Sequence, residues 1–433
     1  MLHPTSPPVL LTADSQGKIT EFPELEAVGM SNGHYHLPQP DDFIPLPEGS
    51  ELFSLPGRLP VGWDPRENEP VLLDENPNRK GQPVRAVAAF MAPAYTSVFN
   101  CGYQTQPAAP TLPLFAYTAV GWHGGSFWVT AFRSDPDKRQ DHSQYDQKTV
   151  VRKTGKKLKA NRNNRLIQHL GKCCLTYGCP AARNYFLDRW EAPLPTSPEC
   201  NARCIGCISL QPTGVCSATQ DRITFVPTAR EISDLAVPHL MQAENPIVSF
   251  GQGCEGEPLL QADVLQAAIV QIRSKTSRGT INLNSNSSLP DSIAKLAEAG
   301  LDSLRVSLNS VQEIYYTRYY RPKGYTFADV KQSIRIMKEN NRFVSLNYFV
   351  LPGVTDSVEE FETLCRFITS CKPDLIQLRN LNMDPEWYLN ILKFPKDSVS
   401  MGIHRWLQSL KESFPDLQFG YFNPQTVQPL SSE

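Results

Sequence analysis

The sequence predicts an α/β protein: a partial (β/α)6 TIM-type barrel of parallel strands, preceded by a β-rich, proline-rich N-terminal domain. Residues 183–381 alternate short apolar runs with longer stretches of helical periodicity, which is typical of a parallel sheet with right-handed crossovers. The six strand–helix repeats are fewer than the eight that close a barrel. Of the 37 prolines, 18 lie in residues 1–115. Because proline has no backbone N–H to donate, strands there should be short or lie at sheet edges.

The strands predicted for the barrel are the apolar runs at residues 186–190, 247–250, 280–283, 303–308, 343–350 and 375–381. The helices predicted between them have helical apolar spacing and cover residues 230–242, 259–274, 290–299, 327–339 and 358–369. Asp291 and Ser357 lie near two predicted helix starts, and Gly300 follows a helix as a C-terminal cap would. The C-terminal extension, residues 382–433, should add a helix at 402–412 and a strand at 418–422.

The first 182 residues divide into a β-rich domain and a joint that leads to the barrel. In the N-terminal domain, residues 1–135, two β-prone runs flank Gly124 and Gly125, which indicates a hairpin. Residues 136–182 form a polar and basic joint. We interpret its basic run as a solvated linker that passes into a helix, with a contact for phosphate or an acidic peptide as the alternative.

Charge and hydropathy exclude several classes of protein. The 433 residues carry a formal net charge of −2, which argues against wholesale coating of nucleic acid. No apolar run reaches the roughly 18 residues of a membrane span. The first residues lack the features of a signal peptide. We therefore expect a cytoplasmic protein with no membrane partner.

Polar side chains alternate with apolar ones along four of the predicted barrel strands. Because the apolar face should meet the helices, the other face would point into the barrel. A polar lumen costs stability unless a polar group occupies it, so we infer a polar ligand there, with an open sheet facing solvent as the alternative. The residues on this face are Asn282, Asn284, Arg305, Ser307, Asn309, Asn347, Gln377 and Arg379.

The 11 cysteines are the strongest chemical signal in the chain. Cys200, Cys204 and Cys207 are spaced as C-x3-C-x2-C. Three thiolates on one short loop can hold three irons of a [4Fe–4S] cluster and leave the fourth iron open to a substrate or cofactor. Zinc is the alternative, and it would take Cys216 as a fourth ligand.

The sequence resembles the radical S-adenosylmethionine (SAM) superfamily at several motifs over roughly residues 183–381. The cysteine motif matches the superfamily's cluster loop, and residues 249–258 are similar to its Gly-Glu-Pro-type motif after the second strand. Residues 303–309 with the following loop, and residues 349–356, resemble the ends of the fourth and fifth strands. One position departs from the family, because Gly206 stands where an aromatic residue commonly packs near the adenine. We expect Ile205 or another loop residue to take over that contact.

The resemblance implies a mechanism and a set of site residues. A [4Fe–4S] cluster on Cys200, Cys204 and Cys207 would cleave SAM reductively to a 5′-deoxyadenosyl radical that abstracts a substrate hydrogen. An external electron donor such as a flavodoxin or ferredoxin would reduce the cluster. The expected contacts with SAM are Gly253, Glu255, Gly256 and Glu257 around the amine, Asn284, Ser307 and Asn309 along the ribose and carboxylate, and Arg305 at the carboxylate.

The other cysteines admit two interpretations. Cys173, Cys174 and Cys179 lie within seven residues and would ligate an auxiliary iron–sulfur cluster, with Cys216 or Cys101 as the fourth ligand. The alternative is that they are small core residues. Cys254 should lie near the first cluster without ligating it, and Cys365 and Cys371 are expected in the core.

Two functions of different class remain open at this point. The first is a radical SAM enzyme that acts on a protein or peptide, an RNA or a small metabolite. The second is a non-catalytic zinc- or iron–sulfur-binding scaffold or redox sensor. The motif at residues 249–258 and the polar lumen favour the enzyme.

Overall fold

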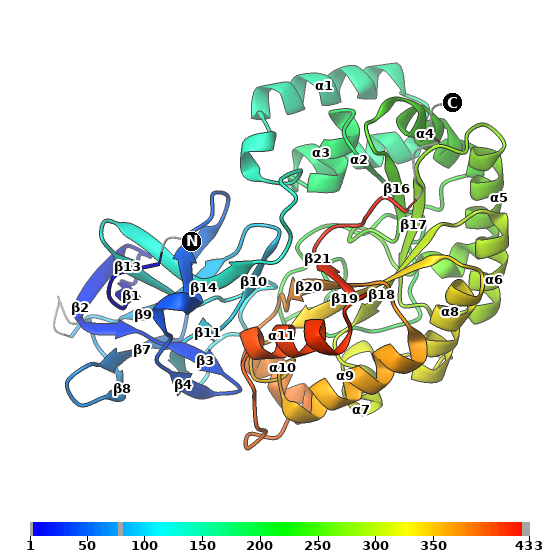
Figure 1. The fold of residues 1–433 in the computed structure, drawn as a ribbon. Helices are drawn as coiled ribbons and strands as arrows, with labels where there is room; N and C mark the ends of the chain where they lie inside the picture. The colour runs from blue at the N-terminus through cyan, green and yellow to red at the C-terminus, as the bar shows by residue number, and fades with distance from the viewer. Residues whose placement is uncertain (1–2, 77–80, 427–433) are drawn as a thin grey trace.

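The computed structural model describes residues 3–76 and 81–426. A β-rich N-terminal part lies beside a larger α/β part, with three helices between them in the chain (Figure 1). The predicted fold class is confirmed. The limits that the sequence predicts for the four segments of the chain stay predictions.

The N-terminal part consists of short antiparallel strands, as its proline content predicts. Seven strands follow one another through the main sheet in the order β10-β14-β13-β1-β2-β7-β12, and a small sheet has the order β11-β3-β4. The predicted hairpin is β13 and β14, where His123 pairs with Ser126. The strands are β1 (Val9–Ala13), β2 (Ile19–Ala27), β3 (Gly29–Ser31), β4 (His34–His36), β5 (Phe43–Pro45), β6 (Glu51–Ser54), β7 (Arg58–Asp64), β8 (Glu69–Leu72), β9 (Arg85–Phe90), β10 (Tyr95–Ser97), β11 (Asn100–Cys101), β12 (Tyr103–Thr105), β13 (Val120–His123) and β14 (Ser126–Arg133).

The basic joint is mostly helical. It forms α1 (Gln147–Ala160), α2 (Arg165–Leu175) and α3 (Pro180–Phe186). Side chains cap two of these helices, because Asp146 accepts from the Thr149 amide and Asn164 from the Ile167 amide. Some of the basic residues form ion pairs within the protein rather than facing solvent alone, and these include Lys157 with Asp188 and Arg165 with Glu231.

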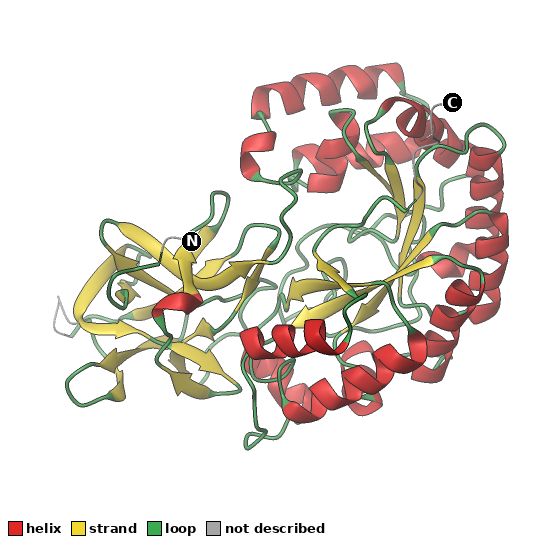
Figure 2. Ribbon diagram, in the orientation of Figure 1, coloured by secondary structure: helices red, strands yellow, loops and turns green. Residues whose placement is uncertain are grey.

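The α/β part is a seven-stranded parallel sheet in sequence order, with helices on its outer face (Figure 2). Short 3-10 turns cover Pro40–Asp42, His142–Gln144 and Pro258–Gln261. The strands are β15 (Glu191–Leu194), β16 (Ile247–Phe250), β17 (Thr280–Ser285), β18 (Ser303–Leu308), β19 (Phe343–Val350), β20 (Leu375–Asn380) and β21 (Gln418–Gly420). The helices are α4 (Ala229–Gln242), α5 (Ala262–Arg273), α6 (Pro290–Ala299), α7 (Glu313–Tyr320), α8 (Phe327–Glu339), α9 (Val358–Cys371), α10 (Pro385–Leu392) and α11 (Ile403–Ser413).

Two details of the predicted sheet are wrong. The first strand is Glu191–Leu194 and not residues 186–190, because Phe186 ends α3 with its side chain fully buried. A short apolar run fits a helix end as well as a strand, so its period does not separate the two. The sheet also has seven strands rather than six, because the strand expected at 418–422 forms as β21 and pairs in parallel with β20. The segment between β20 and β21 contains α10 and α11.

Helix ends in the barrel follow their sequence signals. Ser357 caps α9 and accepts from the Glu360 amide. Gly300 ends α6 at φ +111°, a left-handed conformation that favours glycine. Asp291 lies in the first turn of α6, where a negative charge interacts favourably with the helix dipole. No helix among the described residues is both long and apolar enough to span a bilayer.

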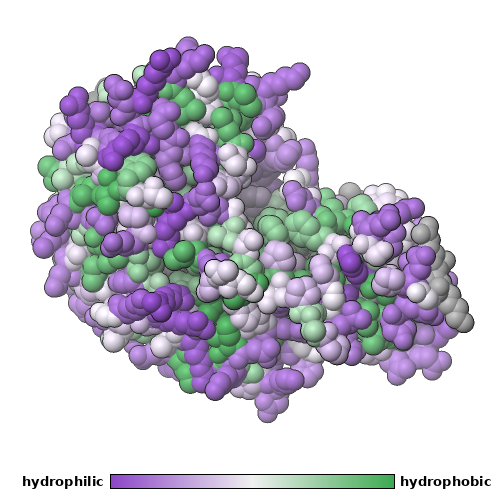
Figure 3. All heavy atoms as spheres, turned by 180° about the vertical axis from the view of Figure 1, so that it is seen from behind, coloured by the Kyte–Doolittle hydropathy of each residue, from purple (hydrophilic) through white to green (hydrophobic). Residues whose placement is uncertain are grey.

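The N-terminal part docks against the ends of the last barrel strands. At the end of β20, Asn380 accepts from the Ser97 amide at 2.9 Å and donates to the Tyr95 carbonyl at 3.0 Å. Asp384 forms a buried ion pair with Arg58 of β7 at 2.8 Å. Figure 3 shows the two parts as unequal lobes joined at a narrower waist. The N-terminal part therefore covers one side of the barrel opening, where enzymes of this architecture place their sites.

Candidate functional site

A cavity of about 390 Å³ lies at the carboxyl ends of the barrel strands. Its volume is within the range of small-molecule sites. Both sequence motifs reach it, and so do strands β17 to β20 and two residues of the N-terminal part, Phe90 and Met91. The predicted site residues that line it are Cys200, Cys204, Cys207, Gly253, Glu255, Gly256, Glu257, Asn284, Arg305 and Ser307.

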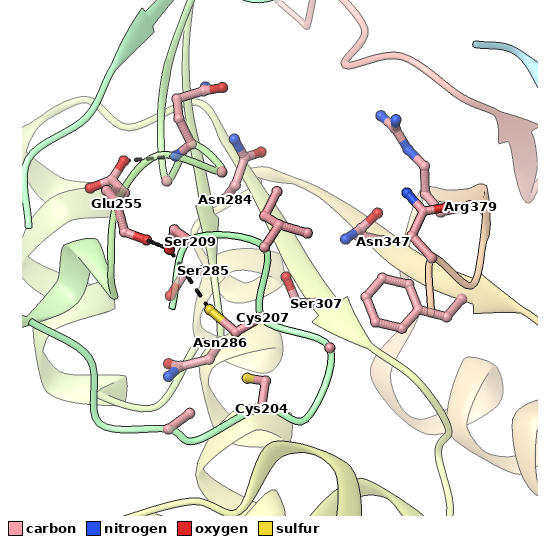
Figure 4. Close-up of a pocket in the computed structure, with 18 of the residues that line it drawn as sticks. Cys204, Cys207, Ser209, Glu255, Asn284, Ser285, Asn286, Ser307, Asn347 and Arg379 are labelled. Atoms are coloured by element: carbon pink, nitrogen blue, oxygen red, sulfur yellow. Dashed lines mark hydrogen bonds between the residues drawn. The ribbon is translucent and has the colours of Figure 1, made fainter. Parts of the chain in front are cut away.

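The cysteine loop follows β15 and is held to α7 by its backbone. The Arg203 amide donates to the Tyr320 carbonyl at 2.9 Å, and the Ile205 amide donates to the Tyr319 carbonyl at 3.1 Å. These bonds fix the loop between the two flanking cysteines of the motif. In Figure 4, Cys204 and Cys207 both lie on this loop at one end of the cavity.

The three motif cysteines fit an iron–sulfur cluster better than a single ion. Burial raises the pKa of Cys200 to about 11 and that of Cys204 well above its ordinary value, so their thiolates need a metal to become favourable. Among the described residues, the sulfur atoms of these three cysteines do not all lie within 4.8 Å of one another. Sulfurs bound to different irons of a cluster are spaced more widely than sulfurs on one zinc ion. The residues present therefore fit a [4Fe–4S] cluster.

Arg222 is a site residue that sequence reasoning missed. Its guanidinium donates to Cys207 Sγ at 3.4 Å and to Ser209 Oγ at 3.1 Å. Hydrogen bonds to cluster sulfurs are one of the factors that set reduction potential. No motif marks this arginine, because it lies 15 residues after Cys207 and folds back to it.

Two glycines let the second motif approach its neighbours closely. At Gly251, where φ is +75°, a Cβ would lie 1.7 Å from the Asn284 carbonyl oxygen. At Gly256 a Cβ would lie 1.9 Å from the Glu199 carbonyl oxygen. Any side chain at Gly256 would push the motif away from the cysteine loop, which starts at the next residue after Glu199. The pattern of glycines thus sets the distance between the two motifs.

The two motif carboxylates are buried and are held by backbone amides. Glu255 accepts from the amides of Thr196 and Gln252, each at 2.7 Å. Glu257 accepts from Ser285 Oγ at 2.6 Å and from the Asn286 amide at 2.8 Å. Burial raises the pKa of each glutamate to about 7. Both are thus poised between neutral and charged forms at physiological pH.

The binding of SAM should tighten about tenfold between pH 6 and pH 8. Glu257 would be largely protonated at pH 6 and largely ionised at pH 8, and only the carboxylate attracts an ammonium group. Isothermal titration with SAM measures this on cluster-loaded protein. Glu257→Gln should bind SAM weakly and with no such pH dependence, whereas Glu255→Gln should keep the dependence. If the SAM affinity of Glu257→Gln still rose as much between pH 6 and pH 8, the Glu257 carboxylate would not be the group that attracts the ammonium.

The polar strand residues divide into two sets. Ser307 and Asn347 point into the cavity, and no hydrogen bond to another described residue occupies their side chains (Figure 4). Asn282 and Gln377 are fully buried below the cavity, where Asn282 donates to Asn284 Oδ1 at 2.8 Å. The polar face of the sheet therefore points inward, not to bulk solvent, and its outer half is open to a ligand.

Asn309 is the predicted contact that the structure does not bring to the cavity. Its amide donates to the Tyr315 carbonyl at 3.2 Å and to Tyr388 Oη at 3.1 Å. It follows β18 on the loop toward α7, so it holds α7 and α10 together instead of facing the lumen. Strand alternation fails there because β18 ends at Leu308.

An aromatic ring from another element fills the space beside Gly206. A Cβ at Gly206 would lie 2.7 Å from Tyr319 Oη and 3.3 Å from Met383 Sδ. Tyr319 lines the cavity, whereas Ile205 packs into the core. Ile205 thus does not line the cavity, and the expectation that it or another loop residue replaces the missing aromatic contact stays a prediction. Tyr319 lies on α7, after the fourth strand of the sheet. Its position in the sequence does not by itself predict a contact with Gly206.

Comparisons with known proteins agree with this geometry. Residues 194–368 match the family model described as the radical SAM superfamily. A GTP 3′,8-cyclase of Lactiplantibacillus plantarum is 26% identical over 166 residues, which cover 38% of this chain and 46% of that protein. The chain thus spans about half the length of this curated relative.

Two solved structures have a similar arrangement over about half of the chain. Streptococcus suis SuiB bound to precursor peptide SuiA is 14% identical, with a TM-score of 0.38, and the match covers 55% of this chain and 52% of SuiB. A radical SAM methyltransferase from Sphaerobacter thermophilus is 19% identical, with a TM-score of 0.33, and the match covers 48% and 64%. The family match confirms the resemblance: residues 194–368 are similar to the radical SAM superfamily, and both motifs of this segment reach one cavity.

Proposed function

We propose that the protein is a radical SAM enzyme whose cavity binds a [4Fe–4S] cluster, SAM and a substrate. The observation that carries this proposal is the meeting of the cysteine loop and the second motif at one end of a polar cavity. When bound and reduced, the cluster supplies the electron that splits SAM into methionine and a 5′-deoxyadenosyl radical, which takes a hydrogen atom from the substrate.

The chain's own residues hold and orient these groups. Cys200, Cys204 and Cys207 would ligate the cluster. The backbone of Gly253 and Gly256 and the carboxylate of Glu257 would face the SAM ammonium, while Glu255 fixes the loop through three backbone amides. Asn284 and Ser307 would face the ribose. Asn309 would act as a positioning residue outside the cavity.

Electrons would come from an external donor such as a flavodoxin or ferredoxin. All eleven cysteines are free thiols, which fits a reducing compartment, and we keep the cytoplasm as the proposed location. Phe90 and Met91 of the N-terminal part line the cavity and would restrict the access of water to the radical.

The alternative is a scaffold or redox sensor that binds metal without catalysis. Such a protein needs the cysteine loop but not the cavity, the amide-bound glutamates or the free polar side chains of Ser307 and Asn347. These features favour the enzyme.

Iron analysis and electron paramagnetic resonance test the proposal. Protein reconstituted without oxygen should hold about four irons on the motif cysteines, and the signal of its reduced cluster should change when SAM is added. Cys365→Ser is the matched control, because Cys365 is half-buried on α9, away from the motif. A zinc-loaded protein with no iron signal, or a signal that SAM leaves unchanged, would favour the scaffold.

We also propose that the substrate carries an anionic group, carboxylate or phosphate. Arg305 on β18 and Arg379 on β20 line the cavity and donate to the same oxygen of Gln377, at 3.2 and 3.5 Å. Neither arginine forms an ion pair with a carboxylate in the described part of the chain. Glu191 acts on Arg305 only from farther away, since its carboxylate accepts from Ser249 and Asn423.

The two arginines carry more positive charge than their surroundings compensate. Burial and the charge of Arg379 lower the pKa of Arg305 to about 9. The Nε atoms of both guanidiniums are buried without a partner in the described structure. A bound anion would supply both the charge and the acceptors. The relative named GTP 3′,8-cyclase acts, by its name, on a ligand of this charge class.

The position of Arg379 favours a substrate anion over the carboxylate of SAM. Figure 4 shows Arg379 and Asn347 across the cavity from Cys204 and Cys207, where the superfamily binds the amino-acid end of SAM. The sequence-based expectation that Arg305 takes the SAM carboxylate stays a prediction, and it is the competing outcome of the test.

Inorganic phosphate and malonate serve as probes of the arginine pair in cluster-loaded protein saturated with SAM. We expect both to raise the melting temperature of the wild type, and Arg379→Gln or Arg305→Gln to remove this rise while SAM affinity changes less than about twofold. Arg230→Gln, at an exposed position, is the control. If Arg305→Gln instead weakens SAM binding about tenfold or more and phosphate still stabilises, the pair serves the SAM carboxylate.

A further inference from the structure

We propose that His169, Cys173 and Cys254 bind one zinc ion at a site separate from the cysteine loop. Among the described residues, this is the group of three metal-binding side chains whose ligand atoms all lie within 4.8 Å of one another. It unites α2 of the joint with the second motif, two segments about 80 residues apart in the chain. The proposal does not depend on the proposed radical chemistry.

The distances suit a tetrahedral ion. His169 and Cys173 are four residues apart on α2 and so share one face of the helix. Cys173 Sγ and His169 Nε2 are 3.6 Å apart. Bonds of about 2.3 Å to sulfur and about 2.0–2.1 Å to nitrogen, at the tetrahedral angle, place the two atoms about 3.6 Å apart. The pair is therefore already spaced as two ligands of one zinc.

Cys254 completes the group from the loop after β16. Its backbone carbonyl accepts from the Ile223 amide at 2.7 Å, which holds the loop in place. Its side chain is hydrogen-bonded to Cys173, and this bond is the main cause that lowers the pKa of Cys173. Both thiols are buried, with 1% and 4% exposure, whereas His169 is half-buried. Zinc would replace the thiol protons, and its fourth position would open toward water on the histidine side.

Several cysteines that the sequence predicts for an auxiliary cluster lie away from this group. Cys174, next to Cys173, turns toward α1 and is 3.4 Å from Thr154 Oγ1. Cys101 lies in the N-terminal part and donates to the Val87 carbonyl at 3.0 Å. Cys216 is half-buried on another loop, where its charged neighbour is Asp384. Cys174, Cys101 and Cys216 therefore have other neighbours, whereas His169 and Cys254 lie at single-ion distances from Cys173.

The charges around the group are compatible with a neutral Cys2His–zinc unit. From α2, Lys172 adjoins the site and pairs with Asp221 on the neighbouring loop. From the start of α3, Cys179 acts on both thiols, and from the second motif Glu255 acts on Cys254. A divalent cation with two thiolates adds no net charge to this buried region, whereas two bare thiolates would be costly.

A zinc ion here would anchor the loop that faces SAM. Cys254 lies between Gly253 and Glu255, which both line the cavity. The zinc ion would thus not contact the reacting atoms. It would hold α2 of the joint and the loop of the second motif in a fixed relative position.

Cobalt titration of full-length protein tests the site apart from the cluster. The background is the Cys200→Ala, Cys204→Ala, Cys207→Ala variant, which should bind no iron. We expect it to take up about one Co(II), with the absorption of tetrahedral thiolate coordination, and to release the cobalt when zinc is added. In the same background, Cys254→Ser and His169→Gln should each weaken cobalt binding about tenfold or more, and Cys174→Ser should not.

Three results would overturn the proposal. The first is no cobalt uptake by the background variant, or the same uptake after Cys254→Ser and His169→Gln, with native circular dichroism in each. The second is a Cys173–Cys254 disulfide in protein purified without oxygen. The third is a second cluster, seen as about eight irons per chain in the wild type. None of these depends on whether the wild type cleaves SAM, so failure here and failure of the proposed enzyme are distinguishable.

Discussion

Cys204→Ala should bind no stable [4Fe–4S] cluster and form no detectable 5′-deoxyadenosine from SAM. With two thiolates left on the loop, the cluster loses one of its three protein ligands. The loop itself should stay folded, because backbone bonds to Tyr319 and Tyr320 hold it and not the thiol. Iron and sulfide content, with the visible absorption of the reconstituted protein, measure the loss.

Cys371→Ala is a suitable comparison, because this buried cysteine ends α9 in the core and lines no part of the cavity. It should cost stability but keep about four irons. If Cys204→Ala retained the cluster and its activity, the assignment of the motif cysteines as ligands would be wrong.

Arg58→Ala should lower the free energy of unfolding by about 3–5 kcal/mol. The Arg58–Asp384 pair joins the N-terminal part to the barrel, and each side chain has an exposure of only 3%. Without the arginine, the Asp384 carboxylate would keep its bonds to the amides of Leu112 and Glu386 but lose its counter-charge in a dry environment. Denaturant unfolding of the full chain measures the change.

The matched control is Arg230→Ala, which breaks an ion pair with Asp234 on the surface of α4. The side chains of Arg230 and Asp234 are 88% and 51% exposed, so the free energy of unfolding should fall by less than about 1 kcal/mol. Equal effects of the two variants would show that the buried pair does not stabilise the interface. Arg58→Ala should also impair the cavity, because the N-terminal part supplies Phe90 and Met91.

Much of the barrel could be predicted because periodicity and motifs act locally. The predicted and observed limits agree for β16, β18, β19, α6 and α8. The first strand could not be located, since the apolar run that ends at Phe186 suits a helix end as well. The N-terminal part could be predicted only as β-rich, because its pairing joins strands such as β1 and β13 that lie over 100 residues apart.

The cluster ligands could be predicted because they are contiguous in sequence and carry a specific spacing. Arg222 and Tyr319 could not, because tertiary folding alone brings them to Cys207 and Gly206. The group of His169, Cys173 and Cys254 escaped for the same reason: its helix and its loop meet only in the folded chain. Asn309 illustrates the opposite error, in which strand alternation was extended one residue beyond the strand.

The most direct test of the central claim is product analysis of the reduced, cluster-loaded protein incubated with SAM without oxygen. The account predicts 5′-deoxyadenosine and methionine in equal amounts, with neither product from the variant that lacks Cys200, Cys204 and Cys207. A protein that holds about four irons, binds SAM and accepts the electron, yet forms no 5′-deoxyadenosine, would contradict it.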